Sequence, residues 1–142
     1  MKKILILLFI FVFPLFSEFS LYSDGFSIET RDKFDNIDCE LFAFTHNNKD
    51  IMLLAFTSPE RPKYMSIDSL LFSLVDDEGV KYENGYYRMI ISDKKSLKYI
   101  LQKMTEGEDI TITTENNIYS FEFNKYKKDI IKNKFYKKIM EQ

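Results

Sequence analysis

Short apolar runs, many of them alternating with polar residues, recur along the chain and end at Asp, Asn, Gly or Pro. Such runs are typical of strands in which at least one face is buried. The pattern predicts strands at residues 26–29, 39–44, 51–56, 70–75, 80–83, 86–91, 110–114 and 118–123. The Asn84-Gly85 pair predicts a type I′ hairpin, because both central residues of that turn need a positive φ. We therefore expect residues 70–75, 80–83 and 86–91 to form an antiparallel meander.

Two segments follow the helical period instead. Between residues 92 and 106, positions i, i+3, i+4 and i+7 form one apolar stripe, made of Leu97, Ile100, Leu101 and Met104. Ser92 can cap this helix and Gly107 can end it. Residues 126–142 are also predicted to be helical, with Ile131, Phe135 and Ile139 on one stripe and lysines over most of the remaining surface.

These elements predict a mainly β protein of the β-rich α+β class. Short strands at hairpin spacing favour an antiparallel β-sandwich or a half-open barrel, with one internal helix and one C-terminal helix. The sequence contains neither the strand–helix–strand rhythm nor the Gly-rich loop of nucleotide-binding α/β folds. Its 142 residues provide for a single domain with an appendage.

The first residues have a pattern of their own. Two lysines precede thirteen uncharged apolar residues, 4–16, and the small residue Ser17 is followed by Glu18. This arrangement predicts a signal peptide at residues 1–17, cleaved after Ser17, and a periplasmic or secreted protein. The alternative is an uncleaved membrane anchor. It is disfavoured because thirteen helical residues span only about 20 Å of the roughly 30 Å hydrocarbon core of a bilayer.

Charge is divided unevenly along the exported chain. Residues 18–124 hold 11 basic and 20 acidic residues, whereas residues 125–142 hold seven lysines and two acids. We expect a β domain over the first range, with its internal helix at about 92–106, and a basic amphipathic helix over the second. That helix can dock on the acidic body, which we favour because its apolar stripe needs a surface, or it can contact a partner or a membrane peripherally. Its candidate contact residues are Lys132, Lys134 and Lys138.

Composition removes several classes of function. One Cys and one His exclude an intramolecular disulfide and metal sites built from several cysteines or histidines. The acidic body would repel phosphate, so nucleic acid is not expected as a partner, and no cofactor is expected. Cys39 could act as a nucleophile with His46 as its base, or pair with a thiol of another protein. We favour the remaining alternative, a buried structural thiol.

Two clusters of side chains are candidate sites. Aromatic residues and an arginine, the composition of an interaction hot spot, surround the predicted hairpin turn: Tyr82, Tyr86, Tyr87 and Arg88. Since neighbouring residues of a strand face opposite sides, one of Tyr86 and Tyr87 should be exposed. A loop with Asp32, Asp35 and Asp38 could hold Ca²⁺, but the spacing differs from an EF-hand and the loop has no glycine. A solvated loop without metal is expected there.

The order of these features resembles the small exported β proteins grouped with invasion-associated locus B and the VasI-like secretion accessory proteins. The likeness covers about residues 26–130. It rests on an aromatic first strand at Phe26, the Asp-rich loop, a strand pair, a helix leading into Asp109-Ile110-Thr111-Ile112, and a closing Phe121-Glu122-Phe123 strand. Those families usually have a Trp near the first strand and often paired cysteines, which this chain lacks. The resemblance implies a non-catalytic accessory protein.

The sequence thus favours an exported, non-catalytic β domain that binds a protein or a component of the bacterial cell envelope. One alternative is a small envelope hydrolase or inhibitor that uses turn carboxylates, for which residues 76–78 and 106–109 are candidates. Another is a membrane-tethered structural protein that keeps residues 1–17. A pocket with two facing carboxylates would favour the enzyme, whereas a flat surface with Tyr and Arg would favour binding.

Overall fold

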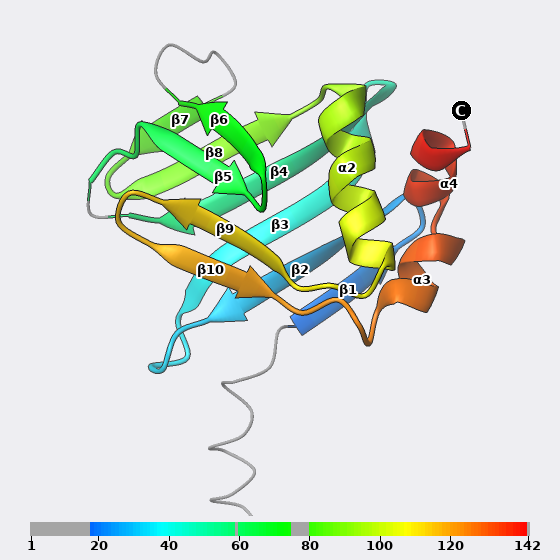
Figure 1. Ribbon diagram of the computed structural model, residues 1–142, viewed down its shortest axis with the longest axis horizontal. Helices are drawn as coiled ribbons and strands as arrows, with labels where there is room; N and C mark the ends of the chain where they lie inside the picture. The colour runs from blue at the N-terminus through cyan, green and yellow to red at the C-terminus, as the bar shows by residue number, and fades with distance from the viewer. Residues whose placement is uncertain (1–17, 59, 75–79, 142) are drawn as a thin grey trace, which may run out of the picture.

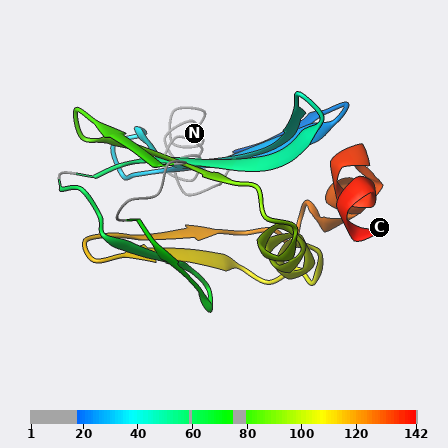
Figure 2. The same ribbon diagram turned by 90° about the horizontal axis from the view of Figure 1, so that it is seen from above.

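Two antiparallel sheets lie one above the other as the two layers of the structure (Figures 1 and 2). The computed structural model describes residues 18–58, 60–74 and 80–141, so the predicted signal peptide lies outside it. The six-stranded sheet has the order β1 (Glu18–Tyr22), β2 (Gly25–Arg31), β3 (Ile37–His46), β4 (Lys49–Thr57), β8 (Tyr86–Ile91) and β7 (Val80–Glu83). The four-stranded sheet has the order β10 (Ile118–Phe121), β9 (Ile110–Thr114), β5 (Tyr64–Ile67) and β6 (Leu70–Ser73).

The inner faces of the two sheets form one hydrophobic core. Inward-pointing residues such as Phe26, Ile28 and Leu41 are at most 1% exposed. The ring of Phe56 on β4 meets that of Tyr119 on β10, with centroids 5.2 Å apart, so the layers are in direct contact. Every pairing between neighbouring strands is antiparallel, and the described strands form two sheets and no closed barrel. The predicted mainly β, α+β class is therefore confirmed, in the form of a two-layered sandwich.

The predicted meander is wrong in one of its three strands. β7 and β8 form the expected hairpin, and its turn residues Asn84 and Gly85 have φ of 52° and 76°. β6, however, pairs with β5 in the opposite sheet. The sequence pattern could not show this, because an apolar run of that length fits either layer equally well.

Two strands were not predicted. β5 is only four residues long and follows the proline-containing loop at residues 58–63, and it pairs with β6 and β9. β1 lies in the segment next to the predicted cleavage point, and it pairs with β2 over its full length. β1 is an edge strand of the six-stranded sheet, and β5 lies between β9 and β6 in the other sheet. The other strands of both sheets were predicted, so these two enlarge the sandwich without changing its class.

The internal helix, α2 (Lys94–Thr105), agrees with the prediction. Its four stripe residues, Leu97, Ile100, Leu101 and Met104, are all buried. The cap is Asp93 and not Ser92: the Asp93 carboxylate accepts a hydrogen bond of 2.9 Å from the Ser96 amide. An aspartate here also suits the positive end of the helix dipole. Gly107, with φ of 76°, takes the left-handed conformation that ends the helix.

The C-terminal segment is broken into two short helices, α3 (Lys127–Lys132) and α4 (Lys134–Met140), where one continuous helix was predicted. Asn133 between them has φ of −72° and ψ of 141°, which is extended backbone. The break changes the phase of the helical stripe. Ile130 is buried in place of the predicted Ile131, which is 42% exposed, while Phe135 and Ile139 are buried as predicted.

The side-chain amide of Asn133 joins these helices to the turn between β1 and β2. Its Nδ2 donates to the carbonyl oxygens of Tyr22 at 2.9 Å and Gly25 at 3.0 Å. Its Oδ1 accepts a hydrogen bond from the Phe135 amide at 3.0 Å, and so caps α4. Asn133 is 6% exposed; its bonds to Gly25 and Phe135 are buried, and its bond to Tyr22 is partly buried. We call this set of hydrogen bonds the Asn133 clamp.

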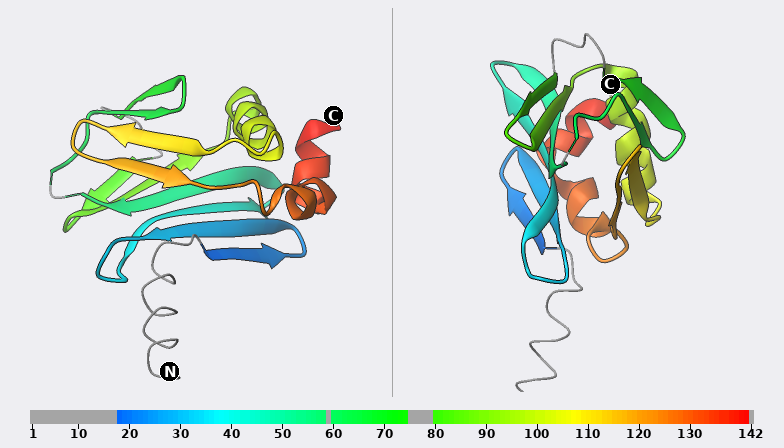
Figure 3. Two further views of the ribbon diagram at one scale, coloured as in Figure 1. Left: turned by 60° about the horizontal axis from the view of Figure 1, so that its bottom comes forward. Right: turned by 90° about the vertical axis from the view of Figure 1, so that its left-hand side faces the viewer.

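A second contact ties α4 to the turn between β3 and β4. The Lys138 ammonium donates to Thr45 Oγ1 at 3.0 Å and forms an ion pair with Asp50 at 3.4 Å. The terminal helices thus lie at one end of the sandwich, beside α2 (Figures 1 and 3). This is the docking on the β body that the sequence favoured.

Because Phe135 is fully buried and Ile131 is not, the two positions should respond differently to truncation. Phe135→Ala should lower the free energy of unfolding by about 3–5 kcal/mol, through lost apolar burial and a cavity. Ile131→Ala, the matched control, should lower it by less than about 0.5 kcal/mol. Urea denaturation measures both. Equal losses at the two positions would contradict the docked arrangement.

Candidate functional site

The predicted Tyr–Arg cluster is divided between the two faces of the six-stranded sheet. Tyr87 is fully buried in the core against Phe56, with ring centroids 4.5 Å apart. Tyr82 pairs with Tyr87 across β7 and β8, and its hydroxyl donates to the Ser58 carbonyl at 2.8 Å. Tyr86 and Arg88 are exposed on the outer face. The predicted alternation of Tyr86 and Tyr87 is thus confirmed, and of the four residues only Tyr86 and Arg88 are exposed.

The outer face of the six-stranded sheet carries an apolar row. Phe42 on β3 lies opposite Leu53 on β4, and Leu53 lies opposite Ile90 on β8. Phe44 and Ile51 form a neighbouring pair. In the described part of the chain, the helices lie at one end of the sandwich and leave this face uncovered (Figures 2 and 3). We call the face the outer sheet surface.

A charged row runs beside the apolar one. In the register, Glu29 on β2 lies opposite Glu40 on β3, Glu40 opposite Ala55, and Ala55 opposite Arg88. Acidic side chains therefore stand on β2 and β3, and a basic one on β8. The small side chain of Ala55 separates the two signs. The row crosses four strands, so no local sequence pattern could predict that these residues lie side by side.

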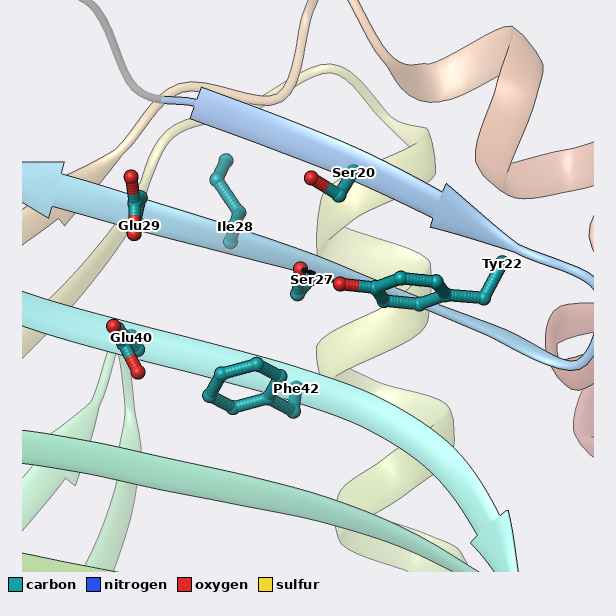
Figure 4. Close-up of a pocket in the computed structure, with 7 residues that line it drawn as sticks. All are labelled: Ser20, Tyr22, Ser27, Ile28, Glu29, Glu40 and Phe42. Atoms are coloured by element: carbon teal, nitrogen blue, oxygen red, sulfur yellow. Dashed lines mark hydrogen bonds between the residues drawn. The ribbon is translucent and has the colours of Figure 1, made fainter.

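A hollow of about 160 Å³ opens on the acidic side of this surface (Figure 4). Seven residues line it: Ser20, Tyr22, Ser27, Ile28, Glu29, Glu40 and Phe42. The Tyr22 hydroxyl and Ser27 Oγ are 3.1 Å apart and form a hydrogen bond, which holds the Tyr22 ring over the strands. Two aromatic rings and two carboxylates thus share one shallow depression.

The two carboxylates of the hollow have different surroundings. Glu29 accepts a hydrogen bond of 3.0 Å from Arg31, which also donates to the Asp35 carbonyl at 3.0 Å. Glu40 forms no ion pair with any residue that the structure describes. Burial first, and then the charge of Glu29, raise the pKa of Glu40, while Arg31 opposes the rise. Glu40 also contributes, after burial, to a raised pKa of the Tyr86 phenol.

The two carboxylates of the hollow stand side by side on one face of the sheet. Glu29 and Glu40 are cross-strand neighbours, so their side chains point in the same direction from one sheet face. The two acids of a glycosidase must flank the bond that is cleaved, which side-by-side carboxylates on an open surface do not do. Of the predicted turn acids, Glu108 pairs with Lys103 at 3.2 Å and Glu106 accepts from Gln102 at 3.2 Å. The acids at residues 76–78 lie outside the described residues.

The Asp-rich loop folds around its own backbone. Asp32 Oδ1 accepts hydrogen bonds from the amides of Phe34 at 2.8 Å and Asn36 at 3.0 Å. Asp35 faces Arg31 at 3.6 Å. Burial and the nearby Asp32 raise the pKa of Asp38, which lies at the start of β3. In the ranges that the structure describes, no three His, Cys, Asp or Glu side chains are placed to hold a metal ion.

Cys39 and His46 are far apart on the same strand. They are seven positions apart along an extended strand, which corresponds to about 23 Å. Cys39 is fully buried, and burial is the main reason that the pKa of its thiol lies well above the usual range. A nucleophilic pair is therefore excluded, and the buried location agrees with the structural interpretation of this thiol.

The three candidate lysines of the terminal segment have different roles. Lys138 is engaged with Thr45 and Asp50. Lys132 and Lys134 instead line a second hollow, of about 270 Å³, between α3 and the β1–β2 turn. The sequence pattern did not predict the Glu29–Glu40 hollow. The alternation Phe26-Ser27-Ile28-Glu29 places Glu29 on an outer face, but only the register of β2 with β3 sets it beside Glu40.

No protein-family model matches the chain, and no significant match was found among curated proteins or solved structures. The resemblance to invasion-associated locus B and VasI-like proteins thus stays a prediction. No helix among residues 18–58, 60–74 and 80–141 has the length and apolar character needed to cross a membrane.

The raised pKa of Glu40 can be measured by carboxyl carbon NMR during a pH titration. It should lie above the usual glutamate value, and Glu29→Gln should lower it by removing the nearby charge. Glu122→Gln, at an exposed position after β10, is the control and should leave it unchanged. A Glu40 pKa that does not respond to Glu29→Gln would contradict the proximity of the two carboxylates.

The sign of the effect on stability follows from proton linkage. A carboxyl whose pKa is raised by folding holds its proton more tightly in the folded state than in the unfolded one. Its contribution to stability is therefore lost as the pH rises from the ordinary glutamate range through the raised pKa. Glu40→Gln should match the parent at low pH and become the more stable protein above that range, as measured by urea denaturation.

Proposed function

We propose that the chain is an exported, non-catalytic binding domain, and that its outer sheet surface holds a basic segment of another cell-envelope protein. Export rests on the signal-peptide pattern of residues 1–17. In this proposal a Lys or Arg side chain of the partner enters the Glu29–Glu40 hollow. Apolar side chains of the same segment cover Phe42, Leu53 and Ile90.

The proposal rests on the surroundings of the Glu40 carboxylate. It is a partly buried carboxylate beside a second carboxylate, and no described cation pairs with it. A ligand cation would relieve this repulsion and gain charge-assisted hydrogen bonds. The rings of Tyr22 and Phe42 line the same hollow, where they offer the faces that cations prefer. Arginine suits the site better than lysine, because its planar guanidinium can bond to both carboxylates and stack on a ring.

The size of the hollow favours a macromolecular ligand. Small-molecule pockets usually measure about 300–1,000 Å³ and enclose most of the ligand. A depression of about 160 Å³ accommodates the end of a side chain and little more. The rest of the contact must then come from the flat apolar row beside it. This division, with one anchor in a pocket and apolar contacts around it, is typical of protein–protein interfaces.

The basic partner also suits the charge of the body. Residues 18–124 carry nearly twice as many acidic as basic residues. Such an imbalance attracts a basic partner over distances comparable with the Debye length and speeds association. An accessory role of this kind is what the resemblance to exported envelope proteins implies.

The charge requirement can be tested with two small probes of nearly equal shape, N-acetylarginine amide and its neutral counterpart N-acetylcitrulline amide. The arginine probe should shift the amide NMR signals of β2 and β3 around Glu29 and Glu40. Citrulline should bind at least about tenfold more weakly, because it lacks the charge that strengthens the hydrogen bonds. Equal binding of the two probes, or none by arginine at millimolar concentration, would contradict the proposal.

Variants of the chain provide the matching control. Glu29→Gln with Glu40→Gln should abolish the arginine shifts, whereas Glu122→Gln should retain them. The double variant and Glu122→Gln then serve as two baits for capture of a partner from the native envelope. A partner that uses the hollow should be retained by Glu122→Gln and lost from the double variant.

A further inference from the structure

The outward face of α3 combines lysines with an exposed isoleucine. Because Ile130 points into the core, Lys128 and Lys132 lie on the opposite side of the helix, and Ile131 lies on the flank next to them. All three are exposed, and Ile131 has 42% of its surface accessible. The break at Asn133 is responsible, since a continuous helix would have carried the predicted stripe through Ile131 into the core.

The end of β1 extends this face. The second hollow, of about 270 Å³, brings Leu21 and Ser23 next to Lys132 and Lys134, with Asp129 as the acidic residue in it. Leu21 is 52% exposed although it is a large apolar residue. We call the set of Lys128, Ile131, Lys132, Lys134 and Leu21 the α3 surface. It presents two aliphatic side chains between three ammonium groups.

The lysines of the α3 surface have no internal role. The side chains of Lys128, Lys132 and Lys134 form neither a hydrogen bond nor an ion pair with any residue of the described ranges. Lys138, by contrast, pairs with Asp50 and belongs to the docking of α4. The charges of these three lysines are therefore available to a partner outside the described chain.

We propose that the α3 surface rests on the anionic phospholipid surface of a membrane. Lysines that attract acidic headgroups, around aliphatic side chains that enter the boundary of the acyl chains, are the recognised composition of interfacial binding surfaces. The apolar run at residues 4–16 favours a bilayer, rather than an acidic protein, as the partner of the α3 surface. As a signal peptide, this run would bring the chain to a bilayer for export, so the exported protein meets an anionic lipid surface.

This contact differs from the membrane mode considered for the sequence. There, the stripe of a free amphipathic helix would enter the lipid; here, Phe135 and Ile139 are buried within the protein. Only Ile131 and Leu21 remain to reach the acyl boundary. Attraction to charged headgroups therefore supplies most of the affinity, and the contact should be shallow, reversible and sensitive to salt.

The absence of tryptophan from the sequence provides a clean fluorescent reporter. Ile131→Trp places a single Trp in the α3 surface. Ile118→Trp is the matched control, because Ile118 is 71% exposed at the start of β10, at the far end of the sandwich (Figure 1). The exported chain is used with the N-terminus that the cell leaves on it. Vesicles of phosphatidylcholine are compared with vesicles that also contain phosphatidylglycerol.

The Ile131→Trp emission should shift to shorter wavelength with the anionic vesicles only, and added salt should reverse the shift. Ile118→Trp should not shift with either vesicle. Lys128→Glu, Lys132→Glu and Lys134→Glu together should weaken vesicle binding at least about a hundredfold, since each lysine near the surface contributes about a factor of five. The unfolding temperature of this triple variant should match that of the parent, because none of the three lysine side chains has a described partner.

Three results would overturn the proposal. The first is an Ile131→Trp spectrum that does not respond to anionic vesicles. The second is an equal response to neutral vesicles, or equal responses at the two reporters, which would assign the contact to another part of the chain. The third is a shift that depends on protein concentration without vesicles, which would make a second copy of the chain the occupant of the α3 surface.

Discussion

The Asn133 clamp is the interaction on which the end of this molecule depends. A single side-chain amide interrupts the terminal helix, caps its second half and holds two carbonyl oxygens of the β1–β2 turn. The bonds to the Gly25 carbonyl and the Phe135 amide are buried, and leaving a buried polar group unpaired costs about 1–3 kcal/mol. Gly25 belongs to the same arrangement, because a Cβ there would collide with the Ala43 carbonyl oxygen of β3. The turn can therefore approach both β3 and the helices only with glycine at this position.

The clamp also relates the two surfaces proposed to bind. Its acceptor Tyr22 lines the Glu29–Glu40 hollow on one side, and Leu21 belongs to the α3 surface on the other. Aromatic stacking reinforces this junction: the rings of Phe19 and Tyr126 are 4.4 Å apart, and those of Phe26 and Phe135 meet edge to face at 6.3 Å. The molecule consequently has an acidic sheet surface and a basic end, kept in fixed relation by one hairpin. A domain so arranged can lie on an anionic membrane while it presents its sheet to a basic partner.

The features that were predicted correctly are those that neighbouring residues determine. The alternation within β2, β3 and β8, the positive φ at Asn84 and Gly85, and the stripe of α2 all follow from neighbouring residues, and all were predicted. The errors concern contacts between residues that are far apart in the sequence. Whether β6 joins one sheet or the other, and whether Asn133 interrupts a helix, depends on partners up to 111 residues away. The Glu29–Glu40 pair was missed for the same reason, since the register of two strands, not the pattern of either, places the carboxylates together.

The Asn133 amide, and not the cap that it forms, holds the β1–β2 turn. Asn133→Asp separates the two roles, because aspartate still caps α4 but cannot donate to the carbonyls of Tyr22 and Gly25. Backbone ¹⁵N relaxation of this variant is the direct measurement. The order parameters of residues 22–25 should fall from the rigid range, near about 0.85, to below about 0.6, while those of β4 and β8 stay unchanged. Order parameters that stay in the rigid range throughout the turn would contradict the account.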